Sequence, residues 1–321
     1  MSSIDFGAVQ PSVVALGGGH GLSVSLTALR QITDDVTAVV TVADDGGSSG
    51  RLRKELGGLP PGDLRMALAA LCRNDAKGHA WRQLLQRRFS TDGPLNGHAV
   101  GNLMIEAAWQ DAGYVHGLEM LGQMIGIKGR VLPMSTVPLD IEAEVLDINP
   151  LSPDEPQTIR GQHDVATTKG KVNSVKLVPA DPPACTQALE AVENADYVVL
   201  GPGSWFTSVL PHLLVPQLAE AITESKAKRI LTLNITADDE TAGFSAARHI
   251  EVIAEHAPML RLDYVLADKS FAADETHLQQ FVASLGAKLV VADLRMRDGS
   301  ARHAPLRLAS AYSELIAPES Y

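Results

Sequence analysis

The sequence predicts an α/β fold with a mainly parallel sheet, helices on both faces and a small β-rich insertion. Short apolar runs rich in β-branched residues alternate with segments of helical periodicity along most of the chain, as expected of βαβ units. Residues 36–42 (VTAVVTV) are apolar on both faces, which is typical of strands buried in a parallel sheet. We expect a single domain over residues 12–300, with the insertion at 131–178 and a C-terminal tail at 301–321.

The first expected unit is a strand at residues 13–16, a glycine turn and a helix on which Leu22, Leu26 and Leu29 recur. Further strands are expected at residues 36–42, 197–200, 229–235, 264–267 and 288–292. Helices are expected at residues 64–71, 79–89, 98–109, 115–124, 185–193, 209–222 and 246–255. Prolines, β-branched residues and short acidic stretches between 131 and 178 predict the strands and loops of the insertion.

Composition excludes several classes of protein. The 321 residues include 27 Lys and Arg against 38 Asp and Glu, a formal net charge of −11, which argues against non-specific nucleic-acid binding. Cys72 and Cys185 are too few for a disulfide framework or a cysteine-rich zinc site. No apolar run approaches the ~20 residues of a membrane span, and residues 1–10 lack the features of a secretory signal. We expect a protein of a reducing compartment, most simply the cytoplasm.

The loops that follow strands are the candidate ligand sites, because ligands bind outside the carboxyl ends of parallel strands. The first is the run Gly17, Gly18, Gly19, His20 and Gly21. Glycine permits positive φ and close approach of a ligand, and the amides of the following helix start suit a phosphate. The run is neither a GxGxxG nor a P-loop motif. The alternative is a turn that only packs strand on helix.

The second loop carries Asp44, Asp45, Ser48, Ser49 and Arg51 directly after a buried strand. Asp44 is placed to accept a hydrogen bond from a ribose hydroxyl, and Asp44 with Asp45 could equally hold Mg²⁺. The alternatives are that the serines cap a helix and that Asp-Gly forms an ordinary turn.

The third loop, with Gly201, Gly203, Ser204 and Thr207, repeats the order of strand, glycine turn and hydroxyl. Ser204 could instead be only a helix cap. A fourth loop, residues 234–241, is expected to be an ordinary connection. Among isolated residues, His98 is a candidate base or ligand, although a structural histidine is commoner, and Arg302 and His303 are expected to be solvated.

The affinity of a nucleotide requires several of these loops together. One helix end contributes only about 0.3–1 kcal/mol toward an exposed anion, whereas micromolar affinity needs about 8 kcal/mol. The sequence therefore predicts that the segments at residues 17, 44 and 201 share one cleft.

Several sequence blocks resemble one protein family. They are GGGHGLS at 17–23, VVTVADDGGSSGRLR at 39–53, PPGDLR at 60–65, GHAVGNL at 97–103, LGPGS at 200–204 and ETAGF at 240–244. These blocks resemble the gluconeogenesis factor family (YvcK-type), a branch of the CofD-like superfamily. The resemblance implies a Rossmann-like protein that binds a UDP-sugar, UDP-N-acetylglucosamine in particular. Such proteins are linked to cell-envelope precursor supply, cell shape and gluconeogenic growth. The resemblance adds Asp63, Asn102, Asn234 and Arg302 to the candidate ligand-binding residues and supports His98.

The chain departs from the family pattern at three places. His20 stands for the usual Thr, Trp205-Phe206 for Leu-Tyr and Asp239 for Gly, changes that bear on the phosphate contacts and the nucleotide preference. The expected partners are a UDP-sugar or related nucleotide, a regulated enzyme and a second copy in a homodimer. An alternative reading is a metal-dependent 2-phospholactate transferase of the CofD type, acting on a deazaflavin with Asp44 or Asp45 as ligand to Mg²⁺. An NAD-dependent oxidoreductase rests on fold analogy alone.

Overall fold

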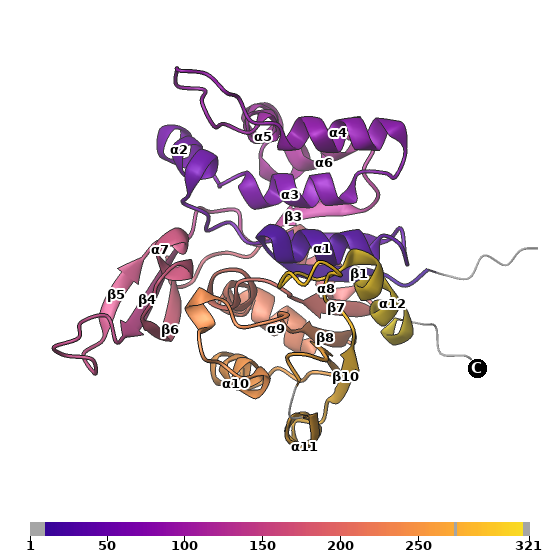
Figure 1. The fold of residues 1–321 in the computed structure, drawn as a ribbon. Coiled ribbons are helices and arrows are strands. Elements are labelled where there is room, and N and C mark those ends of the chain that lie inside the picture. The colour runs from indigo at the N-terminus through magenta and orange to yellow at the C-terminus, as the bar shows by residue number, and fades with distance from the viewer. Residues whose placement is uncertain (1–9, 273–274, 317–321) are drawn as a thin grey trace, which may run out of the picture.

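A seven-stranded parallel sheet forms the centre of the computed structural model, which describes residues 10–272 and 275–316 (Figure 1). Its strand order is β10-β9-β8-β7-β1-β2-β3. The strands are β1 (Val13–Gly17), β2 (Val36–Val40), β3 (Arg130–Pro133), β7 (Tyr197–Leu200), β8 (Lys228–Thr232), β9 (Tyr264–Asp268) and β10 (Lys288–Ala292). Every residue of β1, β2 and β7 is buried, which explains their unbroken apolar sequence. The predicted α/β fold with a mainly parallel sheet is confirmed.

The chain reverses its direction of winding at β1, which lies between β2 and β7. From β1 the sheet grows through β2 to β3 on one side, and from β7 through β8 and β9 to β10 on the other. The loops after β1 and β7 therefore diverge at the same edge of the sheet. In Rossmann-like folds such a switch point is where a ligand crevice opens.

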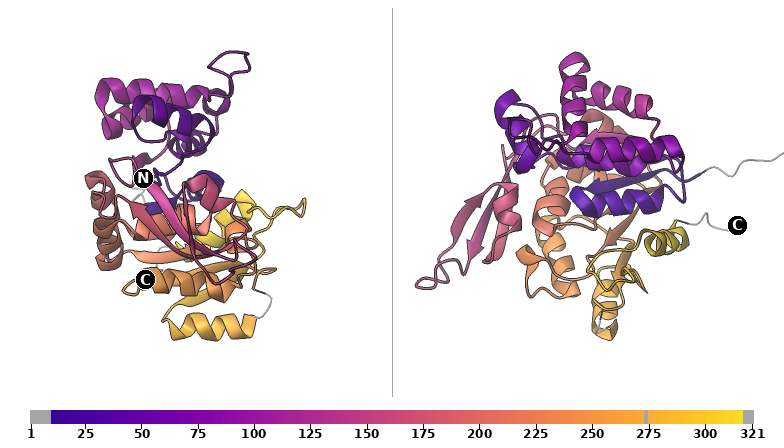
Figure 2. Two further views of the ribbon diagram at one scale, coloured as in Figure 1. Left: turned by 90° about the vertical axis from the view of Figure 1, so that its left-hand side faces the viewer. Right: turned by 45° about the horizontal axis from the view of Figure 1, so that its top comes forward.

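Helices cover both faces of this sheet. The helix α1 (Gly19–Leu29) packs on α3 (Gly62–Leu71) and on α12 (Pro305–Leu315), while α8 (Thr186–Glu193) packs on α9 (Pro216–Glu224). Figure 2, left, shows the pair α8 and α9 on one side of the sheet and the yellow ribbon that follows β10 on the other. The remaining helices are α2 (Gly47–Leu56), α4 (Ala76–Gln86), α5 (Val100–Ala112), α6 (Tyr114–Ile125), α10 (Ala246–His256) and α11 (Glu275–Ser284). No helix of the described ranges has the length and apolarity needed to cross a bilayer.

The insertion is a separate three-stranded antiparallel sheet. It consists of β4 (Asp140–Leu146), β5 (Gln157–Arg160) and β6 (Lys171–Val178), in the order β5-β4-β6, with the short helix α7 (Gln162–Ala166). The expected start at residue 131 is too early, because β3 pairs with β2 in the main sheet. Asp140 joins the insertion to α2 through a 2.6 Å ion pair with Arg53.

The expected tail is largely packed structure. The hydroxyl of Tyr312 on α12 lies 3.0 Å from Ser25 Oγ on α1 and 2.9 Å from Thr232 Oγ1 on β8. Tyr312 is fully buried, so α12 closes the core. Two parts of these expectations lie outside the described residues. They are residues 317–321 of the expected tail and residues 1–9 of the segment expected to lack a secretory signal.

Some expected elements have different bounds. The helix expected at 209–222 is divided into a π-helical turn η1 (Trp205–Val209), a 3₁₀ turn η2 (Leu210–Leu213) and α9. Pro211 and Pro216 lack the amide hydrogen that a continuous helix needs. The polar run after β2 forms helix α2, so Ser48 and Ser49 lie inside a helix and do not cap it. The strand expected at 229–235 ends at Thr232, which leaves residues 234–241 to turn toward the sheet edge.

Candidate functional site

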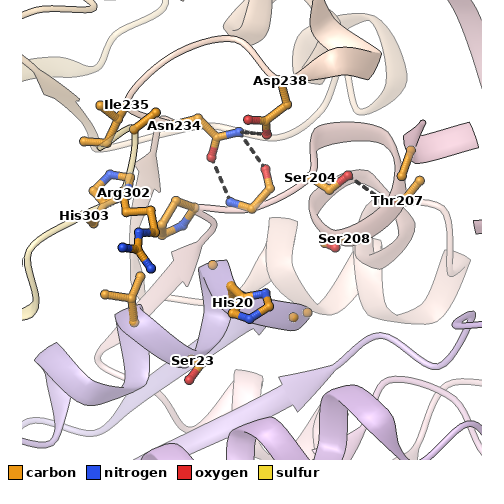
Figure 3. A pocket seen from close by; sticks show the side chains of 18 of the residues that line it. His20, Ser23, Ser204, Thr207, Ser208, Asn234, Ile235, Asp238, Arg302 and His303 are labelled. Atoms are coloured by element: carbon orange, nitrogen blue, oxygen red, sulfur yellow. Dashed lines mark hydrogen bonds between the residues drawn. The ribbon is translucent and has the colours of Figure 1, made fainter. Parts of the chain in front are cut away.

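An open pocket of about 650 Å³ lies at the switch point of the sheet (Figure 3). It is lined by the loops that follow β1, β7 and β8, by α7 and by the segment before α12. Nine predicted site residues line it: Gly18, Gly19, His20, Gly21, Gly203, Ser204, Thr207, Asn234 and Arg302. Its volume lies within the range of small-molecule sites. The first and third predicted loops therefore share one cavity, but the second loop does not line it.

The two glycine loops touch each other at Gly21 and Gly203. A Cβ on Gly21 would lie 2.6 Å from Gly203 Cα and closer still to the Pro202 carbonyl oxygen. Gly201 has φ +73°, a region that favours glycine. Glycine at residue 21 thus allows the start of α1 to pack directly on the turn after β7. Gly17 and Gly201 lie behind the lining residues, at the two strand ends.

The N-terminus of α1 opens into the pocket without a side-chain cap. The amide of Gly19 donates to Asp63, so the following amides of this first turn and the positive end of the helix are what suits an anion. His20 lies on this first turn, and Arg302 enters from the segment before α12, as Figure 3 shows. Arg302 is the only Lys or Arg among the described lining residues, and its side chain is 74% exposed. The solvated state expected for Arg302 is consistent with this exposure, yet the residue borders the pocket.

Asn234 holds the glycine turn in place from the fourth loop. Its Oδ1 accepts from the Gly203 amide at 2.9 Å, and its Nδ2 donates to the Gly203 carbonyl and to Asp238 Oδ2, each at 2.9 Å. The expectation that residues 234–241 form an ordinary connection is wrong, because Asn234, Ile235 and Asp238 line the pocket. Burial, and then the charge of Asp239, raises the pKa of Asp238.

A buried carboxyl pair lies behind the first glycine loop. A Cβ on Gly18 would come within 2.5 Å of Asp63 Oδ2, and one on Gly62 within 2.9 Å of Asp44 Oδ2. Burial, and then the charge of Asp44, raises the pKa of Asp63 to about 7, while a hydrogen bond from the Gly19 amide opposes that rise. Asp63 Oδ2 has no hydrogen-bond partner among the described residues. The second predicted loop thus approaches the first through Asp63.

The two acids expected to hold Mg²⁺ have different surroundings. Asp44 Oδ1 accepts from the Gly46 amide at 2.9 Å. The exposed Asp45 turns to the insertion, where its Oδ1 accepts from the His163 amide of α7 at 3.0 Å. In residues 10–272 and 275–316, no group of three or more His, Cys, Asp or Glu side chains is gathered as a metal site. Asp44 and Asp63, and not Asp44 and Asp45, are the two acids that lie behind the first glycine loop.

The other predicted residues of the second loop stabilise the helical layer. Ser48 Oγ lies 3.0 Å from both His98 Nδ1 and Asn102 Nδ2, and Asn102 Oδ1 accepts from Arg65 Nε at 2.8 Å. Burial lowers the pKa of His98. Arg51 donates to the Asn96 carbonyl at 2.7 Å. Ser48, Ser49, Arg51, His98 and Asn102 do not line the pocket, and this network fits the structural-histidine alternative.

Thirteen of the lining residues were not among the predicted site residues, and three of them carry polar groups that bear on binding. Asp238 and Ser208 line the pocket, and only their positions after strands could have indicated them. His303, expected to be solvated, is 8% exposed and lines the pocket. Burial lowers the pKa of His303 to about 4, so this ring is neutral at physiological pH. Its Nε2 has no partner within the part of the chain that the structure describes.

Comparison with known proteins places this site in a family. The model of the family described as 2-phospho-L-lactate transferase CofD matches residues 13–305. The chain belongs to the CofD family. The match includes every segment that lines the pocket, from the β1 loop to Pro305.

Relatives of this CofD-family chain carry a common name. A Mycobacterium tuberculosis protein named "Putative gluconeogenesis factor" is 50% identical over 303 residues, covering 93% of this chain and 88% of that one. A "Gluconeogenesis factor" of Listeria innocua is 38% identical over 320 residues, covering 96% of each chain. The crystal structure of a upf0052 family member from Bacillus halodurans has a TM-score of 0.83 and 33% identity, covering 95% of this chain and 99% of that one. The resemblance inferred from the sequence blocks is confirmed.

Proposed function

We propose that this protein binds a UDP-sugar, in particular UDP-N-acetylglucosamine, in the pocket at the switch point and acts as a regulatory protein. The observation that carries the proposal is the direct packing of two glycine turns at a helix start whose N-cap is Gly18. Gly19, Gly21 and Gly203 present backbone to the same cavity. A pyrophosphate requires such a cradle, because a side chain at these positions would keep its oxygens away from the amides.

The rest of the pocket suits the remainder of a nucleotide sugar. Arg302 would balance the charge of the diphosphate from the open side. Asp238, held by Asn234, would accept hydrogen bonds from ribose or sugar hydroxyls, the role that the sequence predicts for Asp44. His303 offers an unpartnered ring nitrogen to a polar group of the ligand. A pocket of about 650 Å³ has room for these parts together.

A regulatory role agrees with the name of the relatives, which describes a factor for gluconeogenesis. UDP-N-acetylglucosamine is a precursor of the cell envelope, so the fraction of this protein that has the ligand bound would rise and fall with the supply of that precursor. In this proposal the protein signals by contact with a regulated enzyme, which would connect the ligand to cell shape and to growth on gluconeogenic carbon. A homodimer in the cytoplasm is the state in which we propose that it works.

Calorimetry with a ligand series tests the binding proposal. UDP-N-acetylglucosamine, UDP, UMP and N-acetylglucosamine are titrated into the full chain. We expect affinity to fall at least tenfold from UDP to UMP, because the second phosphate supplies charged hydrogen bonds worth about 1.5–3 kcal/mol each. Absence of heat with millimolar UDP-N-acetylglucosamine and UDP would refute the proposal.

A second function, metal-dependent transfer of 2-phospholactate to a deazaflavin, is favoured by the carboxyl pair Asp44 and Asp63 behind Gly18. The matching family model is named for that transferase. These two carboxyls would hold Mg²⁺, which would supply charge neutralisation at the transferring phosphate. The test is turnover of a nucleotide-activated phospholactate donor with a deazaflavin acceptor and Mg²⁺. Product formation that Asp44→Asn abolishes would support this function, and absence of product would exclude it.

A further inference from the structure

A second pocket of about 420 Å³ lies between the small sheet and α10. Its walls are Asp147 after β4, residues 169–171 at the start of β6, the segment from Glu240 to Phe244, and Arg248 on α10. The 3₁₀ turn η3 (Asp239–Thr241) contacts both β6 and the π-helical turn η1. No described residue lines both pockets, so this cavity is distinct from the proposed UDP-sugar site.

Two of the cations of this second pocket are available to a ligand. Lys169 and Lys171 are exposed and form no ion pair with any described residue. Arg248, by contrast, is held by Glu255 at 2.6 Å and by Glu251 at 3.2 Å, and its guanidinium lies 5.8 Å from the centre of the Phe244 ring. The two lysines therefore provide unbalanced positive charge at the rim, which suits a phosphate.

The inner wall has the opposite character. Glu240 is 2% exposed, and its Oε1 accepts from the Phe206 amide at 3.0 Å. Its Oε2 has no partner among the described residues, although leaving a buried polar atom unpaired costs about 1–3 kcal/mol. Asp147 adds a second carboxylate to the lining. A phosphate monoester in its dianionic form has no hydrogen to donate to these oxygens, whereas an alcohol hydroxyl has one.

We propose that this second pocket binds a small phosphorylated polyol, such as a sugar phosphate, with its phosphate on Lys169 and Lys171 and its hydroxyls toward Glu240 and Asp147. A single anion would satisfy the lysines but would leave the acidic side chains of Glu240 and Asp147 unmatched; burial raises the pKa of Glu240 to about 7, so its carboxyl is only partly charged at neutral pH. A neutral sugar would satisfy the carboxylates but leave the lysines without a counter-charge. Only a ligand with both groups matches both the basic and the acidic residues that line the cavity.

A ligand bound in this second pocket would affect the first pocket through Glu240. The Phe206 amide that donates to Glu240 belongs to the turn after β7, and Ser204 and Thr207 of the same segment line the first pocket. Binding at one pocket is therefore expected to change affinity at the other, and to the same extent in both directions.

The test uses glucose 6-phosphate as probe, with glucose and inorganic phosphate as its two halves, titrated into the full chain by calorimetry. We expect glucose 6-phosphate to bind at least tenfold more tightly than either half. The double variant Lys169→Ala, Lys171→Ala should lose at least tenfold in that affinity. The matched control, Lys54→Ala with Lys226→Ala, removes two exposed lysines elsewhere and should bind as the parent does.

The same titrations show how the inference would fail. Equal affinity in the two double variants, or no heat with 10 mM glucose 6-phosphate, would overturn it. So would loss of probe binding in Arg302→Ala alone, because the probe would then occupy the first pocket. Glu240→Gln should reduce the ratio of the affinity for glucose 6-phosphate to the affinity for inorganic phosphate. If this ratio and the melting temperature are both unchanged in the variant, Glu240 does not bind the hydroxyls. None of these results depends on whether UDP-N-acetylglucosamine binds.

Discussion

Substitution of Gly21 by alanine is the most direct test of the cradle that two glycine turns form. A Cβ at this position would lie 2.6 Å from Gly203 Cα, whereas ordinary contacts begin at about 3.4 Å. The turn after β7 must therefore retreat by about 0.8 Å, and further at the Pro202 carbonyl. Because both obstacles are backbone, no side-chain rotation can relieve the contact.

The energetic balance in Gly21→Ala has two terms. Overpacking costs about 1–3 kcal/mol, while alanine gains up to about 1 kcal/mol in helix propensity, so the net loss of stability is about 0–3 kcal/mol. The change in binding should be larger, since separated loops no longer direct their amides at one pyrophosphate. We expect at least a tenfold weaker Kd for UDP-N-acetylglucosamine by calorimetry.

Gly93→Ala is the matched control for this variant. Gly93 is exposed, and the nearest atom to its added Cβ is Thr91 Oγ1 at 4.0 Å. Both proteins are compared by urea unfolding and calorimetry. If Gly21→Ala binds UDP-N-acetylglucosamine as tightly as Gly93→Ala does, the two turns do not form the phosphate cradle.

Three further predictions concern the same site. Arg302→Ala should weaken UDP binding about tenfold by loss of a charged contact, with an unchanged melting temperature. Arg297→Ala, at an exposed neighbour, should change neither the affinity for UDP nor the melting temperature. If the two variants bind UDP equally tightly, Arg302 is not part of the site. Asn234→Ala should lower the free energy of unfolding in urea by about 1–3 kcal/mol and also weaken UDP binding. The reason is that the amide and the carbonyl of Gly203 lose their hydrogen bonds to the Asn234 side chain. A loss of stability with unchanged affinity for UDP would show that Asn234 does not shape the site. The pKa of Asp63 is about 7 in the folded protein, against an ordinary value of 3.8. Between about pH 4 and pH 7 the folded protein therefore keeps a proton on Asp63 that the unfolded chain releases. The free energy of unfolding consequently falls as the pH rises through this window. Relative to Asp63→Asn, the parent should lose up to about 1.4 kcal/mol per pH unit in that window, and parallel pH profiles would show that Asp63 titrates normally.

Much of the fold could be predicted from local sequence because it depends on local causes. Apolar β-branched runs such as residues 36–40 predict buried strands, and glycines after β1 and β7 predict tight turns at the sheet edge. The bounds were less predictable where local patterns compete. The polar run after β2 could be a turn or a helix by composition, and packing against His98 and Asn102 decides for a helix. The expected helix at 209–222 is divided because prolines interrupt an otherwise apolar segment.

The candidate site was only partly predictable. The sequence indicated the glycine turns because glycine recurs directly after two strands, where its conformational freedom permits a tight turn. It could not separate Asp44 from Asp45, since adjacent carboxylates in a loop can point to different neighbours, here Asp63 and α7. It gave no reason to select Asp238, whose importance arises from the contact of its loop with Gly203.

The amino-acid sequence by itself determined the α/β class, the parallel sheet, the family and the glycine turns, because each depends on residue type and near spacing. Tertiary structure alone decided that the turns after β1 and β7 touch, that His303 and Asp63 are buried, and that Lys169, Lys171 and Glu240 line one second cavity. These facts join residues separated by tens to hundreds of positions. Their proximity is set by strand order and packing, which no local pattern of side chains encodes.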